Sequence, residues 1–133
     1  MFTNYLAQNG ARSKKTVLIV EDHPLFGDML VRAILSVPHY QVIYTMVTDS
    51  SQVLEIASTC TFHVLIIDEH LLFKKGISFD EIAALRQSFK GIPLMILGTE
   101  MFPTYWLDNP YVMRLVTPFS VQEVLHALQV FFR

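Results

Sequence analysis

The chain has 133 residues, which is the size of a single domain with its own hydrophobic core. Apolar residues make up 52% of it, charged residues 17%, and the net charge is −2, which excludes a disordered chain and argues against direct binding of nucleic acid. No apolar run reaches the roughly 18 to 20 residues of a membrane helix, and residues 1–15 lack the apolar core of a signal peptide. With Cys60 as its single cysteine, the chain is expected to be cytoplasmic and away from membranes.

Strand-like and helix-like patterns alternate along the sequence. Residues 1–14 show no period, and we expect them to form a leader, disordered in part, before a domain at 15–133. Strands are predicted at 16–20, 41–47, 64–67, 93–97 and 111–116. Helices are predicted to begin at Pro24, Asp49, Ser78 and Ser120 and to end near Pro38, Cys60, Gly91 and Phe132.

Two of the helix starts carry a capping box, in which a Ser is followed three residues later by a Glu: Ser78 with Glu81, and Ser120 with Glu123. Residues 100–110 differ, because Pro103 and Pro110 leave room for at most one or two helical turns. Strands that alternate with helices across short connections imply parallel strands and right-handed crossovers. We therefore predict an α/β fold with a doubly wound parallel sheet of five strands and a short or irregular fourth helix.

Carboxylates follow two of the predicted strands. The apolar run at 64–67 ends in Asp68, and the run at 16–20 stops at Glu21 and Asp22. In a doubly wound sheet the first and third strands are neighbours, so their carboxyl ends bring these three side chains together. Three carboxylates in one crevice repel one another unless a cation lies among them. Mg²⁺ is the expected cation, because it is hard and takes oxygen ligands.

Residues 15–132 resemble the receiver domain of two-component response regulators. The resemblance rests on the run Val17–Phe26 (VLIVEDHPLF), which is similar to the opening of receivers attached to helix-turn-helix transcription factors. It also rests on Asp68, on Gly76 eight residues later, and on the pair Pro118-Phe119. The resemblance implies a flavodoxin-like sheet of order 2-1-3-4-5. It also implies transfer of a phosphoryl group from a kinase histidine to an aspartate with Mg²⁺ bound.

The resemblance implies a role for each acidic residue. Asp68 matches the phosphoacceptor, Glu21 and Asp22 match the acidic pair that holds the metal together with it, and His70 matches the residue whose backbone carbonyl also binds the metal. A carboxylate is a weak nucleophile, so the transfer needs a cation between the two anions. The alternative, a transition-metal site that uses the imidazoles of His23 and His70, fits no standard zinc spacing. The implied partners are a sensor histidine kinase or phosphotransfer protein and an attached DNA-binding output domain outside this chain.

The chain departs from the family pattern at the positions whose side chains sense the phosphoryl group in that family. Gly98 stands at the family's Ser or Thr position, with Thr99 one residue late, either as a phosphate donor or as a plain loop residue. Thr117 replaces the family's lysine, Arg114 its switch aromatic residue, and Leu72 the proline four residues after the phosphoacceptor. A phosphoryl group adds about −1.5 to −2 charges, which a switch has to sense through such donors. We therefore interpret the chain as an atypical receiver.

Several functions remain open at this stage. The first is a receiver that regulates an output through dimerisation or docking, with phosphorylation weak, optional or absent. The second is a phosphorylation-independent pseudo-receiver, a protein-interaction or dimerisation module with a vestigial pocket. The third and most remote is an aspartate-nucleophile phosphohydrolase of the haloacid dehalogenase type, which needs a second Asp where this chain has His70 and a cap domain for which the chain lacks room. An enzyme is therefore not expected.

The last helix and the segment at 100–116 are the candidates for a symmetric homodimer interface, because both are rich in apolar residues. The segment carries four aromatic residues: Phe102, Tyr105, Trp106 and Tyr111. These either fill the core in place of a missing helix or form a partner surface.

Overall fold

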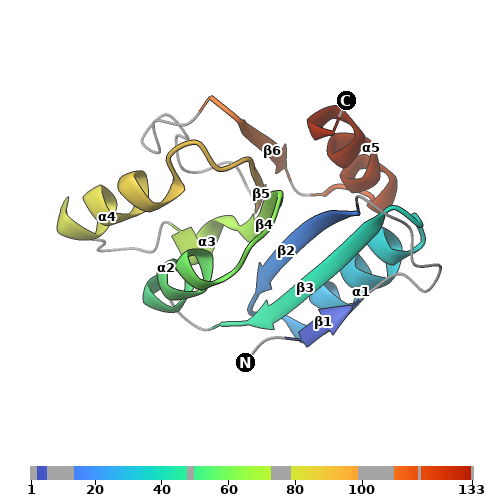
Figure 1. The fold of residues 1–133 in the computed structure, drawn as a ribbon, viewed down its shortest axis with the longest axis horizontal. Coiled ribbons are helices and arrows are strands. Elements are labelled where there is room, and N and C mark those ends of the chain that lie inside the picture. Colours follow the sequence, from blue (N-terminus) through green and yellow to red (C-terminus); the bar gives the residue numbers. More distant parts are fainter. Residues whose placement is uncertain are drawn as a thin grey trace.

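The computed structural model describes residues 3–5, 14–47, 50–72, 79–98, 110–116 and 118–132. Within them lie the strands β1 (Thr3–Tyr5), β2 (Lys15–Glu21), β3 (Tyr40–Met46), β4 (Val64–Asp68), β5 (Leu94–Gly98) and β6 (Val112–Val116). The helices are α1 (Pro24–Leu35), α2 (Ser50–Thr59), α3 (Glu69–Leu72), α4 (Phe79–Phe89) and α5 (Val121–Phe131). The strands form one sheet in the order β1-β3-β2-β4-β5-β6 (Figure 1).

The five strands from β2 to β6 are parallel, and counted along the chain they have the order 2-1-3-4-5. The predicted fold class is therefore confirmed. Its physical basis is the apolar runs of β2, β4 and β5, which are buried along nearly their whole length. Such continuous burial arises only when both faces of a sheet are covered.

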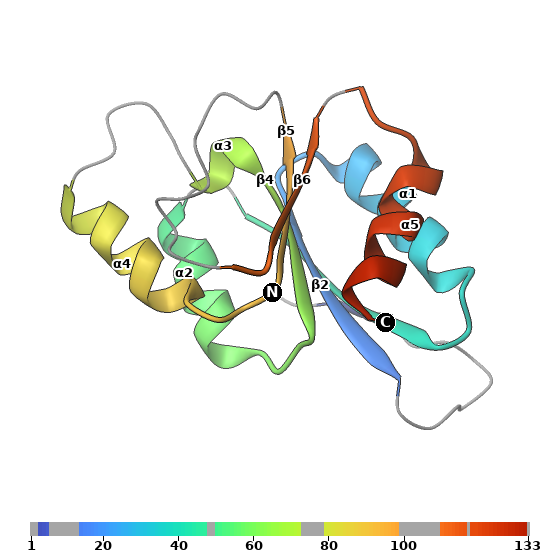
Figure 2. The ribbon, with the colours of Figure 1, turned by 90° about the horizontal axis from the view of Figure 1, so that it is seen from above.

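Helices cover the two faces unequally, with α1 and α5 on one face and α2, α3 and α4 on the other (Figure 2). One core cluster packs α1 and α5 against the sheet through Leu30, Ile34, Val124 and Leu128. The other cluster packs α2, α3 and α4 through Val53, Leu71, Leu72, Leu85 and Phe89. Alternate residues of β4 serve the two clusters, as the two-residue period of a strand requires.

The predicted helix boundaries agree with the structure where it describes them. Pro24 opens α1, and the capping box of Ser120 and Glu123 is present, with the Glu123 N–H donating to Ser120 Oγ at 3.1 Å. Gly91 ends α4 with a φ of +78°, a conformation that favours glycine. The predicted caps at Asp49 and Ser78 lie outside the described residues.

Two short elements were not predicted. β1 pairs antiparallel with β3, Thr3 opposite Tyr44, inside the segment that the sequence indicated as a leader. α3 is a single turn that follows Asp68 directly and buries Leu71 and Leu72. Three residues in β1 and four in α3 are too few for a periodic pattern, which explains why the sequence did not reveal them.

Most of the segment at 100–110, for which the sequence makes a specific prediction, lies outside the described residues. The short or irregular fourth helix expected at 100–110 lies outside the described residues except for Pro110, and so do Phe102, Tyr105 and Trp106. In the part of the chain that the structure describes, no helix is both long enough and apolar enough to cross a lipid bilayer.

Candidate functional site

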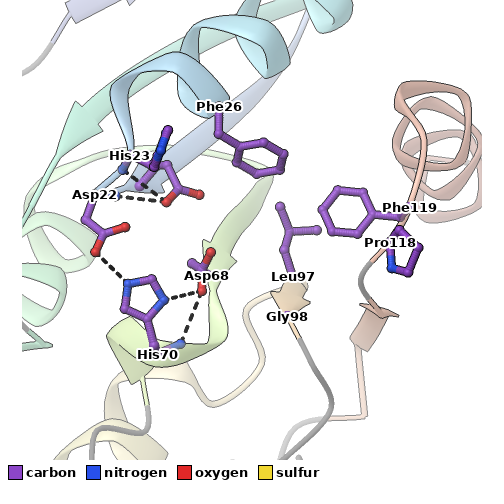
Figure 3. A pocket seen from close by; sticks show the side chains of 10 residues that line it. Asp22, His23, Phe26, Asp68, His70, Leu97, Gly98, Pro118 and Phe119 are labelled. Atoms are coloured by element: carbon purple, nitrogen blue, oxygen red, sulfur yellow. Dashed lines mark hydrogen bonds and ion pairs between the residues drawn. The ribbon is translucent and has the colours of Figure 1, made fainter.

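A pocket of about 510 Å³ lies at the carboxyl ends of β2, β4 and β5 (Figure 3). The residues that line it are Glu21, Asp22, His23, Phe26, Asp68, His70, Leu97, Gly98, Pro118 and Phe119. One half of this pocket is acidic and the other is apolar and aromatic. Its volume lies in the range of small-molecule sites, which is roughly 300 to 1,000 Å³.

The acidic half forms because β2 and β4 are neighbours in parallel register, with Val20 opposite Ile67. Glu21 is the last residue of β2 and Asp68 the last of β4, so both strands deliver a carboxylate to the same edge. The predicted convergence of Glu21, Asp22 and Asp68 in one pocket is therefore what the structure shows. The predicted roles of metal ligand and phosphoacceptor remain predictions.

Glu21 is the most deeply buried member of the acidic group, with 2% of its surface exposed. Its Oε1 accepts hydrogen bonds from the backbone N–H groups of Asp22 (3.0 Å) and His23 (3.3 Å). Burial, a side-chain hydrogen bond with Asp22 and the charge of Asp68 raise the pKa of Glu21 to about 7, against the lowering effect of the two backbone donors. Glu21 therefore holds a proton near neutrality when no cation is bound.

The imidazole of His70 lies between two carboxylates (Figure 3). Its Nε2 is 2.5 Å from Asp22 Oδ2, its Nδ1 contacts Asp68 Oδ1, and its backbone N–H donates to the same Asp68 oxygen at 3.3 Å. Burial lowers the pKa of His70, but the hydrogen bonds and charges of Asp22 and Asp68 outweigh it, so the net shift is upward. When protonated, the ring places a positive charge between the carboxylates of Asp22 and Asp68.

The same contact acts on Asp22. Burial alone would raise the pKa of this carboxyl, but hydrogen bonds with His70 and Glu21 and the charge of His70 hold it below its ordinary value. The prediction assigned only a backbone carbonyl to His70 and so missed its side chain. The only signal in the sequence was an imidazole two residues after Asp68, and the helical turn that brings it between the two carboxylates was not predicted.

The donor set suits Mg²⁺ in type, since Mg²⁺ binds one or two carboxylates and keeps several waters. Among the described residues, however, no group of three or more His, Cys, Asp or Glu side chains is already arranged around a common point for a metal. The imidazole of His70 stands between Asp22 and Asp68 instead. More than half of that side chain (54%) is exposed, so the ring has open solvent into which it can rotate.

The apolar half of the pocket joins the first helix to the segment that follows β6. The rings of Phe26 on α1 and Phe119 meet edge to face, with centroids 5.7 Å apart and an interplanar angle of 69°. Leu97 and Pro118 complete this wall. Thr117, which stands at the family's lysine position, lies outside the described residues.

Two of the departures from the family pattern are explained by one buried ion pair. Arg114 Nη2 on β6 lies 3.2 Å from Glu69 Oε2, and the side chains are 20% and 6% exposed. A Cβ at position 98 would lie 2.7 Å from Glu69 Cβ and 2.8 Å from its Cδ. Gly98 is therefore needed for Glu69 to occupy this space. Glu69 carried no prediction, because an acidic residue next to Asp68 has no distinctive pattern.

The remaining positions divide between the core and the undescribed segments. Leu72, at the family's proline position, is fully buried in the cluster under α3. The loop glycine, Gly76, and Thr99, the predicted phosphate donor, lie outside the described residues.

No sequence-family model matches this chain, and no curated protein matches it in sequence. Among solved structures, the chain is similar to the chemotaxis response regulator CheY4 of Vibrio cholerae, with 25% identity and a TM-score of 0.63 over 89% of this chain and 98% of that one. The receiver domain of a Pseudomonas aeruginosa sensor histidine kinase, which has a magnesium ion in its active-site cleft, gives 21% identity and a TM-score of 0.60 over 89% and 97%. The response regulator RcsB of Salmonella typhimurium gives 21% and 0.68, over 90% of this chain and 59% of RcsB.

Proposed function

We propose that this chain is a receiver domain of the response-regulator type and that it serves two-component signal transduction with Asp68 as its phosphoacceptor. The observation that carries the proposal is the meeting of Glu21, Asp22 and Asp68 in one pocket at adjacent strand ends. A single carboxylate at a strand end would not indicate a function. Three carboxylates together support a binding site, because ligands of open α/β sheets bind at this edge.

In the proposed reaction, a carboxylate oxygen of Asp68 attacks the phosphorus of a phosphohistidine. The oxygen–phosphorus bond forms as the phosphorus–nitrogen bond breaks, and the released imidazole takes up one proton from water. Asp22, Glu21, Asp68 and the backbone carbonyl of His70 would hold Mg²⁺, which when bound supplies positive charge between the two anions. The imidazole of His70 has to leave its place between Asp22 and Asp68 to admit the ion.

The proposed partners follow from this chemistry. A sensor histidine kinase or a phosphotransfer protein would donate the phosphoryl group in the cytoplasm, and the output would lie in an attached or separate domain. RcsB, whose structure concerns DNA interaction, is a neighbour of this chain by fold. We therefore propose a transcription-regulating output domain as the downstream element, with no direct contact between this receiver and nucleic acid.

A second candidate function is favoured by specific observations. The imidazole of His70 already occupies the place between Asp22 and Asp68, and Gly98 offers no side-chain donor beside Asp68. These features suit a phosphorylation-independent pseudo-receiver, an interaction module whose pocket takes no phosphoryl group. The two functions differ in one measurable property, which is whether the pocket binds Mg²⁺ and a phosphoryl analogue.

Beryllofluoride, an analogue of the aspartyl phosphate, is expected to bind the protein only when Mg²⁺ is present. The binding is read from fluorine NMR signals and from calorimetric titration. Asp68→Asn should abolish it, because the attacking oxygen is lost, while Asp80→Asn on the exposed surface of α4 should leave it unchanged. If wild-type protein binds neither species at millimolar concentrations, the second candidate function replaces the first.

We also propose a homodimer that uses the last helix and the segment at 100–116. The described part of this region exposes large apolar side chains, Tyr111 and Val116 at β6 and Val130 on α5. Sedimentation at rising protein concentration should show a dimer, and Tyr111→Ser should weaken it by at least about tenfold, as loss of a buried interface aromatic does. A monomer at several hundred micromolar would refute this interface. Leu25→Ser, an exposed apolar residue on α1, is the control.

A further inference from the structure

We propose that Glu69 and Arg114 form a buried clamp that holds the carboxyl end of β4 against β6 in one arrangement, whether or not Asp68 carries a phosphoryl group. The inference rests on the proposed function, since it concerns how a change at Asp68 is transmitted. The ion pair, hereafter the Glu69–Arg114 clamp, is thus the reason why β6 presents the same surface with and without a phosphoryl group on Asp68.

The clamp spans three strands. Glu69 follows Asp68 at the end of β4, and Arg114 lies in the middle of β6, opposite Ile96 of β5. Because neighbouring strands are about 4.8 Å apart, the Glu69 side chain has to extend across the end of β5 to reach Arg114. The ion pair therefore links two strands that are not neighbours in the sheet.

The crossing is possible only at Gly98. Three Glu69 atoms, Cβ, Cδ and Cγ, would lie 2.7, 2.8 and 3.1 Å from a Cβ at this position. Any other residue at position 98 would force the Glu69 side chain or the strand end to move. Asp68 pairs with Leu97, the residue before Gly98. The aliphatic part of the Glu69 side chain thus fills the space through which a side chain at position 98 could otherwise move toward Asp68.

The surroundings make the clamp costly to open. Ile96, Leu94 and Leu72 are buried in the cluster on the same side of the sheet, and Glu69 itself is 5% exposed. A movement of β6 that separated the two charges would break an ion pair of 3.2 Å in which the Glu69 side chain is only 6% exposed, and the attraction between the charges would be lost in an apolar setting. A phosphoryl group on Asp68 therefore adds its negative charge beside Glu69, whose carboxylate is already paired with Arg114 and held in place.

The first test of the clamp needs no phosphoryl analogue. Gly98→Ser is expected to lower the Tm of wild-type protein by roughly 5 to 10 °C, because the added side chain overlaps Glu69. In the Glu69→Gly background and in the Glu69→Gly/Arg114→Leu background, less than half of that loss should remain, because Glu69→Gly also removes the Cβ that would lie 2.7 Å from the new side chain. The exposed pair Asp28 and Arg32 on α1, 3.0 Å apart, gives the matched control background Asp28→Ala/Arg32→Leu, in which the full loss should persist. Equal losses in all backgrounds would overturn the clamp.

The second test follows the amide resonances of the whole protein with Mg²⁺, with and without beryllofluoride. In wild type, residues 19–23 and 66–70 should shift while residues 112–116 do not. In Glu69→Ala/Arg114→Leu, the resonances of 112–116 should shift as well, and their hydrogen exchange should be about tenfold faster. Shifts of 112–116 in wild type would overturn the clamp. If no resonance moves in either protein, the proposed function fails, and the Gly98→Ser comparison alone decides on the clamp.

Discussion

Replacing Arg114 by Leu is expected to lower the free energy of unfolding by about 3 to 5 kcal/mol, which is the usual cost of removing one partner of a buried ion pair. For a domain of this size that corresponds to a drop in Tm of roughly 10 to 15 °C. The reason is that Glu69, with 6% of its side chain exposed, loses the guanidinium that lies 3.2 Å from its carboxylate. Thermal and urea unfolding, followed by circular dichroism, measure the loss.

Two further variants separate charge from packing. Arg32→Leu removes the cation of an exposed pair, whose side chains are 81% and 52% exposed, and should cost less than about 1 kcal/mol. Glu69→Ala/Arg114→Leu should recover part of the stability lost in Arg114→Leu, because both charges of the ion pair are then removed together. A loss in Arg114→Leu no larger than that in Arg32→Leu would show that the pair does not hold this end of the sheet.

Without added Mg²⁺, the protein is expected to lose stability as the pH rises from about 5 to 8. The pKa of Glu21 is about 7 in the folded state and 4.5 before folding, so the folded state binds the extra proton in this window. The resulting stabilisation is complete below the lower pKa and is lost as the pH rises through the higher one. The shift corresponds to about 3 kcal/mol. The raised pKa of His70 acts in the same direction.

Mg²⁺ should reverse this trend, because it competes with the protons for the carboxylates. Millimolar Mg²⁺ is therefore expected to raise the Tm more at pH 8 than at pH 5.5. Glu21→Gln should flatten the pH dependence, whereas Glu55→Gln, at an exposed position on α2, should leave it as in wild type. Thermal unfolding across this pH range tests both statements, and an equal slope in wild type and Glu21→Gln would contradict the first.

The fold was predictable because its signals are local. The buried runs in β2, β4 and β5 and the capping box of Ser120 and Glu123 are each complete within a few residues. Strand order then followed from the alternation of elements and from the resemblance. The strand at Thr3–Tyr5 escaped prediction because three residues carry no period.

The candidate site was predictable only in part. Glu21, Asp22 and Asp68 were found because each follows a strand, and the topology of the sheet brings those strand ends together. The contacts of His70 were not found, because its side-chain orientation depends on a helical turn that no pattern announces. Glu69, the first residue of α3, and Arg114 on β6 are forty-five residues apart in the sequence, and only a three-dimensional structure pairs them.

The contact between Glu69 and the backbone at Gly98 also constrains the order in which such a sequence can arise. A Glu at position 69 cannot take its observed place while position 98 carries a side chain, so the glycine has to come first. The contribution of Glu69 to stability then depends on Arg114, and that of Arg114 on Glu69, because the two opposite charges lie 3.2 Å apart. Substitutions at these three positions are therefore expected to depend on one another in their effects on stability.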